Sequence, residues 1–190
     1  MNDLIACYVS GKGMYASHAT WTFKTIVMEL LESTQLGYDT RYRFYRNQYP
    51  SMPSNEFARM VCDPIEGYDK DWPTWQAEHT QKYKNKDELV TAFFLERDRR
   101  FQRDAQVAIY GFDEAGFGSG INAMRFINAG KPILGFYNPS FRSKHNNIHN
   151  VIQLQLEHPN LVTLHQYIDA GEFTTKISSW LKNFKKHHKK

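Results

Sequence analysis

Residues 105–139 constrain the fold more than any other part of the chain. This stretch begins with an apolar run from Ala105 to Phe112, a pattern typical of a buried strand. A glycine-rich segment follows, then Ile121 to Ala129 with apolar residues at helical spacing, and then a second apolar run from Pro132 to Tyr137. A strand, helix and strand joined so closely predict a parallel pair of strands with a right-handed crossover.

The rest of the chain alternates in the same way. Further strands are expected at Leu4–Val9, Thr40–Tyr45 and Leu161–Leu164, and further helices after Ser17 and at Asp87–Arg103, Ile148–Glu157 and Phe173–Phe184. We therefore predict a single α/β domain over residues 1–184, with a doubly wound, mainly parallel five-stranded sheet of the Rossmann-like or flavodoxin-like type.

Residues 47–86 differ in character from this pattern. They contain four prolines and many aromatic residues, and they show neither a helical nor a strand period. Such a segment indicates an insertion or lid, not a core element. Two roles remain open for its tryptophans and its polar turn at Asp63–Asp69: they could cover a bound base by stacking, or pack an oligomer interface.

Charge and composition narrow the cellular setting and the partners. The net charge of +4 is carried by the four lysines among residues 185–190, so the body of the chain is not a basic nucleic-acid binder. The tail is expected to be a solvated end that extends the last helix, with contact to phosphate or an acidic partner as the alternative. Two cysteines imply no disulfide framework, and neither a secretory leader nor a long apolar segment is present. We expect a cytoplasmic protein without membrane contact.

The predicted binding site lies where the strands end. In parallel sheets, ligands bind beyond the carboxyl ends of the strands, and the acidic, glycine-rich segment Asp113–Gly120 would lie there. The loops Ser10–Gly13 and Asn138–Lys144 would share that edge, and Arg142 or Lys144 could meet a phosphate. We expect the acids and backbone amides of residues 113–122 to converge on one pocket. The alternative is that the glycines only make a tight turn.

This stretch resembles the nucleoside 2-deoxyribosyltransferase family and its relatives among nucleotide N-glycosidases. The resemblance rests on Asp113-Glu114, Gly118-Ser119-Gly120 and Gly130-Lys131. The family opens its helix with a nucleophilic glutamate nine residues before the lysine, and this chain has Asn122 there. Asn122 is an uncharged amide that cannot form the covalent sugar ester.

The resemblance implies a site for a nucleoside or nucleotide without metal or cofactor, and assembly into homo-oligomers. The implied catalytic residues are Asp113, Glu114 and an acid of the preceding helix, either Glu96 or Asp98, of which Asp98 is preferred. The implied substrate-binding residues are Ser10, Gly11, Tyr15, Gly116, Gly118, Ser119, Gly120 and Asn122.

Two functions follow. One is cleavage or transfer at the N-glycosidic bond, in which an anion stabilises an oxocarbenium-like state and a carboxylate activates water. The other is nucleotide binding without turnover in a regulatory module that has lost the family nucleophile. Dinucleotide binding of the Rossmann type is disfavoured, because the third glycine of the Gly-x-Gly-x-x-Gly motif follows the second by three residues, whereas Gly120 follows Gly118 by two.

Overall fold

The computed structural model shows one sheet of five parallel strands, and it describes residues 4–12, 17–53, 56–57, 71–140 and 148–187. The strands are β1 (Ile5–Ser10), β2 (Gly37–Asp39), β3 (Val107–Gly111), β4 (Ile133–Tyr137) and β5 (Val162–Gln166), in the order β2-β1-β3-β4-β5. All four pairings are parallel. The predicted doubly wound α/β fold is confirmed, because its apolar runs form strands that are buried on both faces.

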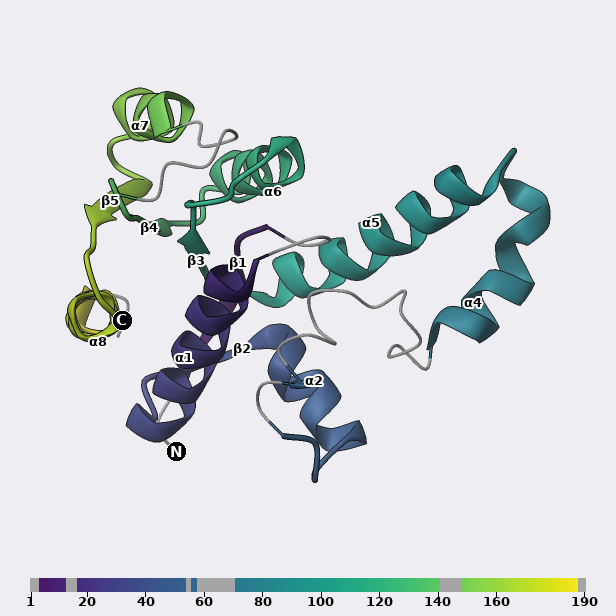
Figure 1. The fold of residues 1–190 in the computed structure, drawn as a ribbon, viewed down its shortest axis with the longest axis horizontal. Coiled ribbons are helices and arrows are strands. Elements are labelled where there is room, and N and C mark those ends of the chain that lie inside the picture. The colour runs from purple at the N-terminus through teal and green to yellow at the C-terminus, as the bar shows by residue number, and fades with distance from the viewer. Residues whose placement is uncertain (1–3, 13–16, 54–55, 58–70, 141–147, 188–190) are drawn as a thin grey trace.

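Helices cover both faces of this sheet (Figure 1). On one face lie α1 (His18–Thr34) and α8 (Ala170–His187), where the Phe23 ring of α1 packs 5.0 Å from the Phe173 ring of α8. The other face carries α6 (Phe117–Asn128), α7 (Ile148–Glu157) and the C-terminal end of α5 (Lys86–Asp104). There, the Tyr8 ring of β1 packs 5.6 Å from the Phe126 ring of α6.

The strand order creates a switch point between β1 and β3. The chain leaves the carboxyl end of β1 toward α1 on one face and the carboxyl end of β3 toward α6 on the other, so these two connections diverge there. Ser10 and Tyr110 are partners in the register there. In doubly wound folds this divergence leaves the crevice in which ligands bind.

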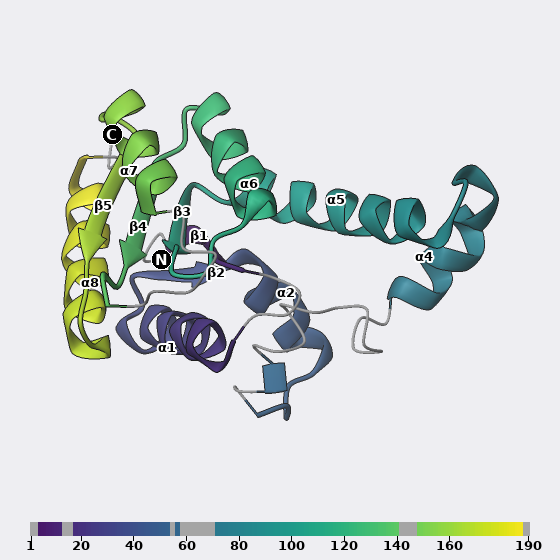
Figure 2. The same ribbon diagram turned by 45° about the horizontal axis from the view of Figure 1, so that its top comes forward.

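A helical arm extends from the body (Figure 2). It consists of α4 (Asp71–His79), the short 3₁₀-helix η1 (Thr80–Lys82) and the first half of α5. Trp72, Leu89 and Phe93 form a buried cluster in the arm that is separate from the main core. The prediction that residues 47–86 lack regular structure is therefore wrong for residues 71–82, because aromatic packing against α5 stabilises helices that have no clear period. The polar turn at residues 63–69 lies outside the described residues.

The predicted strand Thr40–Tyr45 is also wrong, because these residues belong to α2 (Thr40–Gln48). The edge strand is the shorter β2, which ends at Asp39. The Asp39 carboxylate accepts hydrogen bonds from the backbone N–H groups of Arg41 and Tyr42, so it caps α2 and starts the helix. The alternation of tyrosine, phenylalanine and arginine favoured a strand, but the cap and its tertiary contacts determine the outcome.

The α6 helix begins at Phe117, four residues before the predicted start, so Gly118 and Gly120 lie in its first turns. Its exit is as predicted, with Gly130 in the left-handed region at φ 66°. The following Lys131 amino group donates to the carbonyls of Gln102, Arg103 and Ala105 at 3.0, 2.8 and 2.6 Å. The lysine of the Gly-Lys pair thus caps the C-terminal end of α5.

At the C-terminal end of the chain, α8 runs to His187 and so includes the first lysines of the basic tail, as expected. No helix within the described ranges combines the length and the apolar character needed to span a bilayer.

Candidate functional site

The two loops of the switch point lie against each other. The Ser119 hydroxyl in the first turn of α6 donates to the Gly11 carbonyl at 3.2 Å. From the same loop, Glu114 accepts from the Ser17 backbone N–H at 2.9 Å and from the Thr20 hydroxyl at 2.6 Å. The Lys12 amino group lies 3.9 Å from its carboxylate. Burial alone would raise the pKa of Glu114, but these hydrogen bonds and the lysine charge hold it below its ordinary value.

Asp113 is directed to other partners. Its carboxylate accepts from the Asn138 backbone N–H at 2.5 Å and from the Tyr167 hydroxyl, so it ties the end of β3 to the loops after β4 and β5. Asp113 and Glu114 therefore hold different loops, and each carboxylate is engaged by two or more donors. The two carboxylates, which were expected to share one pocket, accept hydrogen bonds from separate loops, because the side chains of adjacent residues after a strand diverge.

The pH dependence of the free energy of unfolding should reflect the environment of the Asp113 carboxyl. Burial raises the pKa of this carboxyl above its ordinary value of 3.8, against the opposing effect of hydrogen bonds from Tyr167 and Asn138. A folded-state pKa above the unfolded value means that the folded protein binds the proton more tightly. The contribution of Asp113 is thus fully present below the unfolded pKa and is lost as pH rises through the folded pKa. Relative to Asp113→Asn, the wild type should lose stability between about pH 4 and the folded pKa.

Urea unfolding of the two proteins at stepped pH measures this difference. The exposed Asp104→Asn variant serves as the control, since 54% of the Asp104 side chain is accessible. A wild-type advantage that stays constant or grows with pH would contradict the assignment.

Neither packing within the described residues nor backbone conformation requires glycine at three positions at the start of α6. Among the residues that the structure describes, a Cβ atom added at Gly116, Gly118 or Gly120 would meet no atom within 4 Å, and none of the three has a positive φ. Gly37 and Gly135 differ, because a Cβ there would come within 2.5 Å of protein atoms. The Gly116 cap also offers α6 no side-chain hydrogen bond. The first turn of α6 therefore exposes backbone that another molecule could approach closely.

Asn122 lies one turn further along α6. It is half-buried, and its side-chain oxygen accepts from Arg125 Nη1 at 2.9 Å. Its amide nitrogen remains a donor for a ligand hydroxyl or base edge. Tyr15, also predicted to bind substrate, lies outside the described residues, as do Arg142 and Lys144.

A buried polar cluster fills the space between α5 and the carboxyl ends of β1 and β3. We call it the switch-point cluster, and it consists of Tyr8, Ser10, Arg41, Arg97, Asp98, Gln102 and Tyr110. The Arg41 guanidinium lies 4.3 Å above the Tyr8 ring and donates to the Val9 carbonyl. Of the two acids left open on α5, Asp98 lies near both tyrosines, whereas Glu96 accepts from Trp75 Nε1 at 3.1 Å in the arm.

Several groups of this cluster are buried without hydrogen-bond partners. Burial and the nearby Asp98 raise the pKa of Tyr8 to about 12 and that of Tyr110 well above its ordinary value. Gln102 lies close enough to Tyr8, and Ser10 close enough to Tyr110, to oppose the rise of the two pKa values. Neither pair has the geometry of a normal hydrogen bond. Within the described part of the chain, partners are therefore lacking for the Gln102 amide, the Tyr110 hydroxyl, and Arg97 Nε and Nη1. Such groups are rare in folded proteins and indicate a missing water or ligand.

Sequence reasoning missed most of this cluster. Tyr8 and Tyr110 stand within apolar runs, a pattern typical of core strands, and Arg97 lies in a run of alternating charge, a pattern typical of a solvent-facing helix surface. A usable signal was the pair of tyrosines close to the ends of two buried strands, since a buried tyrosine hydroxyl usually has a hydrogen-bond partner.

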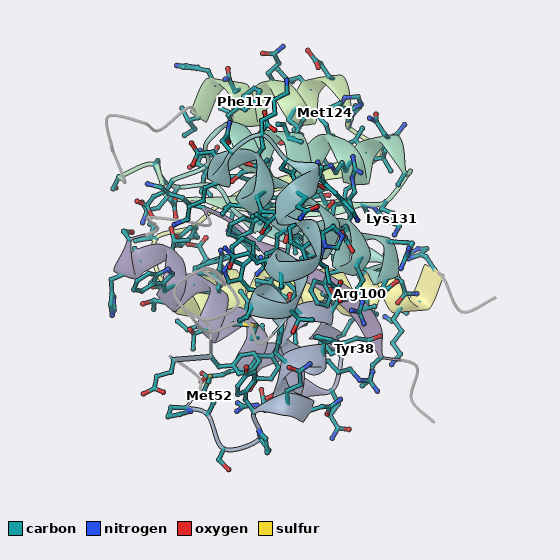
Figure 3. All side chains as sticks on the ribbon, turned by 90° about the vertical axis from the view of Figure 1, so that its right-hand side faces the viewer. Tyr38, Met52, Arg100, Phe117, Met124 and Lys131 are labelled. Carbon is teal, nitrogen blue, oxygen red and sulfur yellow. The ribbon has the colours of Figure 1, made fainter. Side chains whose placement is uncertain are left out.

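An apolar groove of about 920 Å³ lies beside the glycine segment, between α6 and α7. Gly116, Phe117 and Gly120 line one end, and none of the predicted acids lines it. Phe117 is 88% exposed, and Figure 3 shows Phe117 and Met124 on the opposite side of the molecule from Tyr38 and Met52. In the described ranges, no three histidine, cysteine, aspartate or glutamate side chains gather to hold a metal ion.

Comparison with known proteins assigns no family. No family model matches the chain, and no curated protein matches it at a significant level.

Proposed function

We propose that this chain binds a nucleoside or nucleotide at the switch point between β1 and β3. The observation that carries the proposal is the set of buried, unpartnered polar groups in the switch-point cluster. An unsatisfied buried donor or acceptor costs about 1–3 kcal/mol, so a ligand that supplies the partners gains that free energy on binding. The cluster lies where doubly wound folds bind their ligands.

The available chemistry suits a sugar and a base. The Gln102 side-chain amide offers an NH₂ group that donates hydrogen bonds and an oxygen that accepts them. The Tyr110 hydroxyl can donate or accept a hydrogen bond. The open glycines of α6 allow a flat or puckered ring to approach the backbone, and Ser119 and Gly11 join this turn to the end of β1. The resemblance of residues 113–131 to the deoxyribosyltransferase family supports the same ligand class.

Cleavage of the N-glycosidic bond is a second candidate, and the position of Asp98 favours it. Its carboxylate accepts from Arg97 Nη2 at 3.2 Å, and 17% of its side chain is accessible, so it is an anion within reach of a ligand in the cluster. Such a group can stabilise an oxocarbenium-like state or activate water. Asp113 and Glu114 are less suited, because both hold loops together. Asn122 excludes a covalent glycosyl ester at its position.

A thermal shift experiment on the full chain tests binding. At a concentration of 100 Kd, a true ligand stabilises by about 2.7 kcal/mol, which raises the melting temperature of a chain of this size by about 5–10 °C. The panel contains ribonucleosides, deoxyribonucleosides and their 5′-monophosphates. If none of them raises the melting temperature, binding of this class is rejected.

Chromatography of the same mixtures detects released base and so tests turnover. If the second candidate holds, Asp98→Asn should abolish base release but retain the thermal shift. Ligand stabilisation without any product leaves the binding function alone.

A further inference from the structure

A groove of about 540 Å³ runs along α5, where the arm meets the body (Figure 2). Residues of α2, α4 and α5 line it. Three of its aromatic rings are buried, namely Tyr45, Phe93 and Phe101, and three are half-buried, namely Phe44, Trp75 and Tyr83. The half-buried rings leave apolar surface in the groove that the side chains of another molecule could cover.

Exposed arginines lie beside these rings. Arg99, Arg100 and Arg103 come from the C-terminal half of α5 and line the groove. Arg103 lies 3.5 Å from the exposed Asp104 carboxylate, a pair that contributes little in water. Within the described part of the chain, Arg99 and Arg100 form no ion pair. The Arg100 guanidinium lies 4.4 Å from the centre of the Phe44 ring, which supplies no acceptor for its N–H groups.

The acids near the groove do not neutralise these arginines. Glu96 is the one carboxylate among the described lining residues, and it accepts from Trp75 Nε1 at 3.1 Å. Asp98 accepts from Arg97, whose side chain is only 8% exposed. The groove therefore carries positive charge that the described residues leave unbalanced.

Capping of α5 does not explain this charge. Basic side chains often gather at the C-terminal end of a helix, because the last carbonyls lack partners. Here the Lys131 amino group already donates to the carbonyls of Gln102, Arg103 and Ala105. Since the tail lysines carry the net charge of the chain, the body is close to neutral, and the arginines form a local concentration of charge. Such a concentration beside apolar surface indicates an anionic partner with apolar groups.

We propose that this groove docks an acidic peptide segment of a partner protein. Apolar side chains of the segment cover the half-buried rings, and its carboxylates pair with Arg99 and Arg100. A guanidinium presents parallel N–H donors that match the two oxygens of a carboxylate. Arginine and aromatic residues are also the types enriched where proteins bind partners. This docking site is separate from the switch-point cluster and requires no nucleoside.

An acidic peptide fits the groove better than single-stranded nucleic acid does. Bases bind proteins by stacking on free aromatic faces. Trp75 is already stacked on the His79 ring at 4.2 Å, and half of the rings in the groove are buried. The Glu96 carboxylate would also repel a phosphate backbone.

Fluorescence polarisation with the full chain and labelled peptides tests the proposal. The probe is a pool of short peptides in which aspartate or glutamate alternates with phenylalanine, leucine or tryptophan. One reference pool has glutamine in place of the acids, and another has serine in place of the apolar residues. The wild type should bind the acidic apolar pool at least about 10-fold more tightly than either reference pool.

Variants at exposed positions assign this binding to the groove. Arg99→Gln/Arg100→Gln should weaken binding of the acidic apolar pool by about 10- to 100-fold and reduce its dependence on salt. Arg43→Gln/Lys182→Gln is the matched control, because it removes the same charge at exposed positions outside the groove. It should leave the affinity unchanged.

Three results would overturn the proposal. They are absence of binding by the acidic apolar pool, equal binding by the serine pool, and equal losses in the two double variants. Single-stranded oligonucleotides that bind through Arg99 and Arg100, where the acidic pool does not, would assign the groove to nucleic acid instead. Because the assay contains no nucleoside, each of these failures leaves the proposed function intact.

Discussion

Replacing Asp39 with alanine is expected to lower the free energy of unfolding by about 3–5 kcal/mol. The Asp39 side chain is fully buried. It accepts from the backbone N–H groups of Val9, Arg41 and Tyr42 at 2.7, 2.9 and 2.8 Å, and it lies 3.7 Å from the Arg41 guanidinium. Alanine would remove the cap of α2, a bond to β1 and the partner of a buried charge. Urea unfolding at neutral pH measures the loss.

Two further variants identify the cause. Asp39→Asn keeps an acceptor for the helix cap and should lose less stability than alanine. Asp104→Ala removes an exposed ion pair and should change stability by at most about 0.5 kcal/mol. If the urea midpoint of Asp39→Ala were close to that of Asp104→Ala, the hydrogen bonds and ion pair of Asp39 would contribute little to stability.

The double variant Gly118→Ala/Gly120→Ala should become more stable and bind its ligand less well. Alanine is favoured over glycine inside a helix by about 0.5–1 kcal/mol per residue, and the added methyl groups meet no atom of the described residues. If a ligand lies against this turn, the methyl groups intrude on it, at a cost of about 1–3 kcal/mol, or about 5- to 150-fold in affinity. Chemical unfolding and titration with the ligand found in the thermal shift panel measure the two effects.

Gly171→Ala is the matched control for this pair. Gly171 also lies in the first turn of a helix, and a Cβ there would meet only the Asp169 carboxylate at 3.3 Å. It should leave affinity unchanged. Unaltered affinity in the double variant would show that the ligand does not approach the start of α6.

The sequence alone determined the order of the strands and helices over most of the chain. The apolar runs before Asp113 and after Lys131 became β3 and β4, and Ile148–Glu157 became α7 with the predicted bounds. These elements are readable because their periodicity is local and because strands buried on both faces require continuous apolar runs.

Only the tertiary structure decided which polar groups share a site. Asp113 and Glu114 are neighbours in sequence, yet they hold different loops. Tyr8 is far from Arg97 and Tyr110 in sequence, yet the parallel pairing of β1 with β3 and the packing of α5 bring the three together. The physical reason is the separation of the interacting residues along the sequence. Helix and strand periods arise from residues a few positions apart, whereas burial of a polar side chain depends on elements that are distant in sequence and pack against it in the fold.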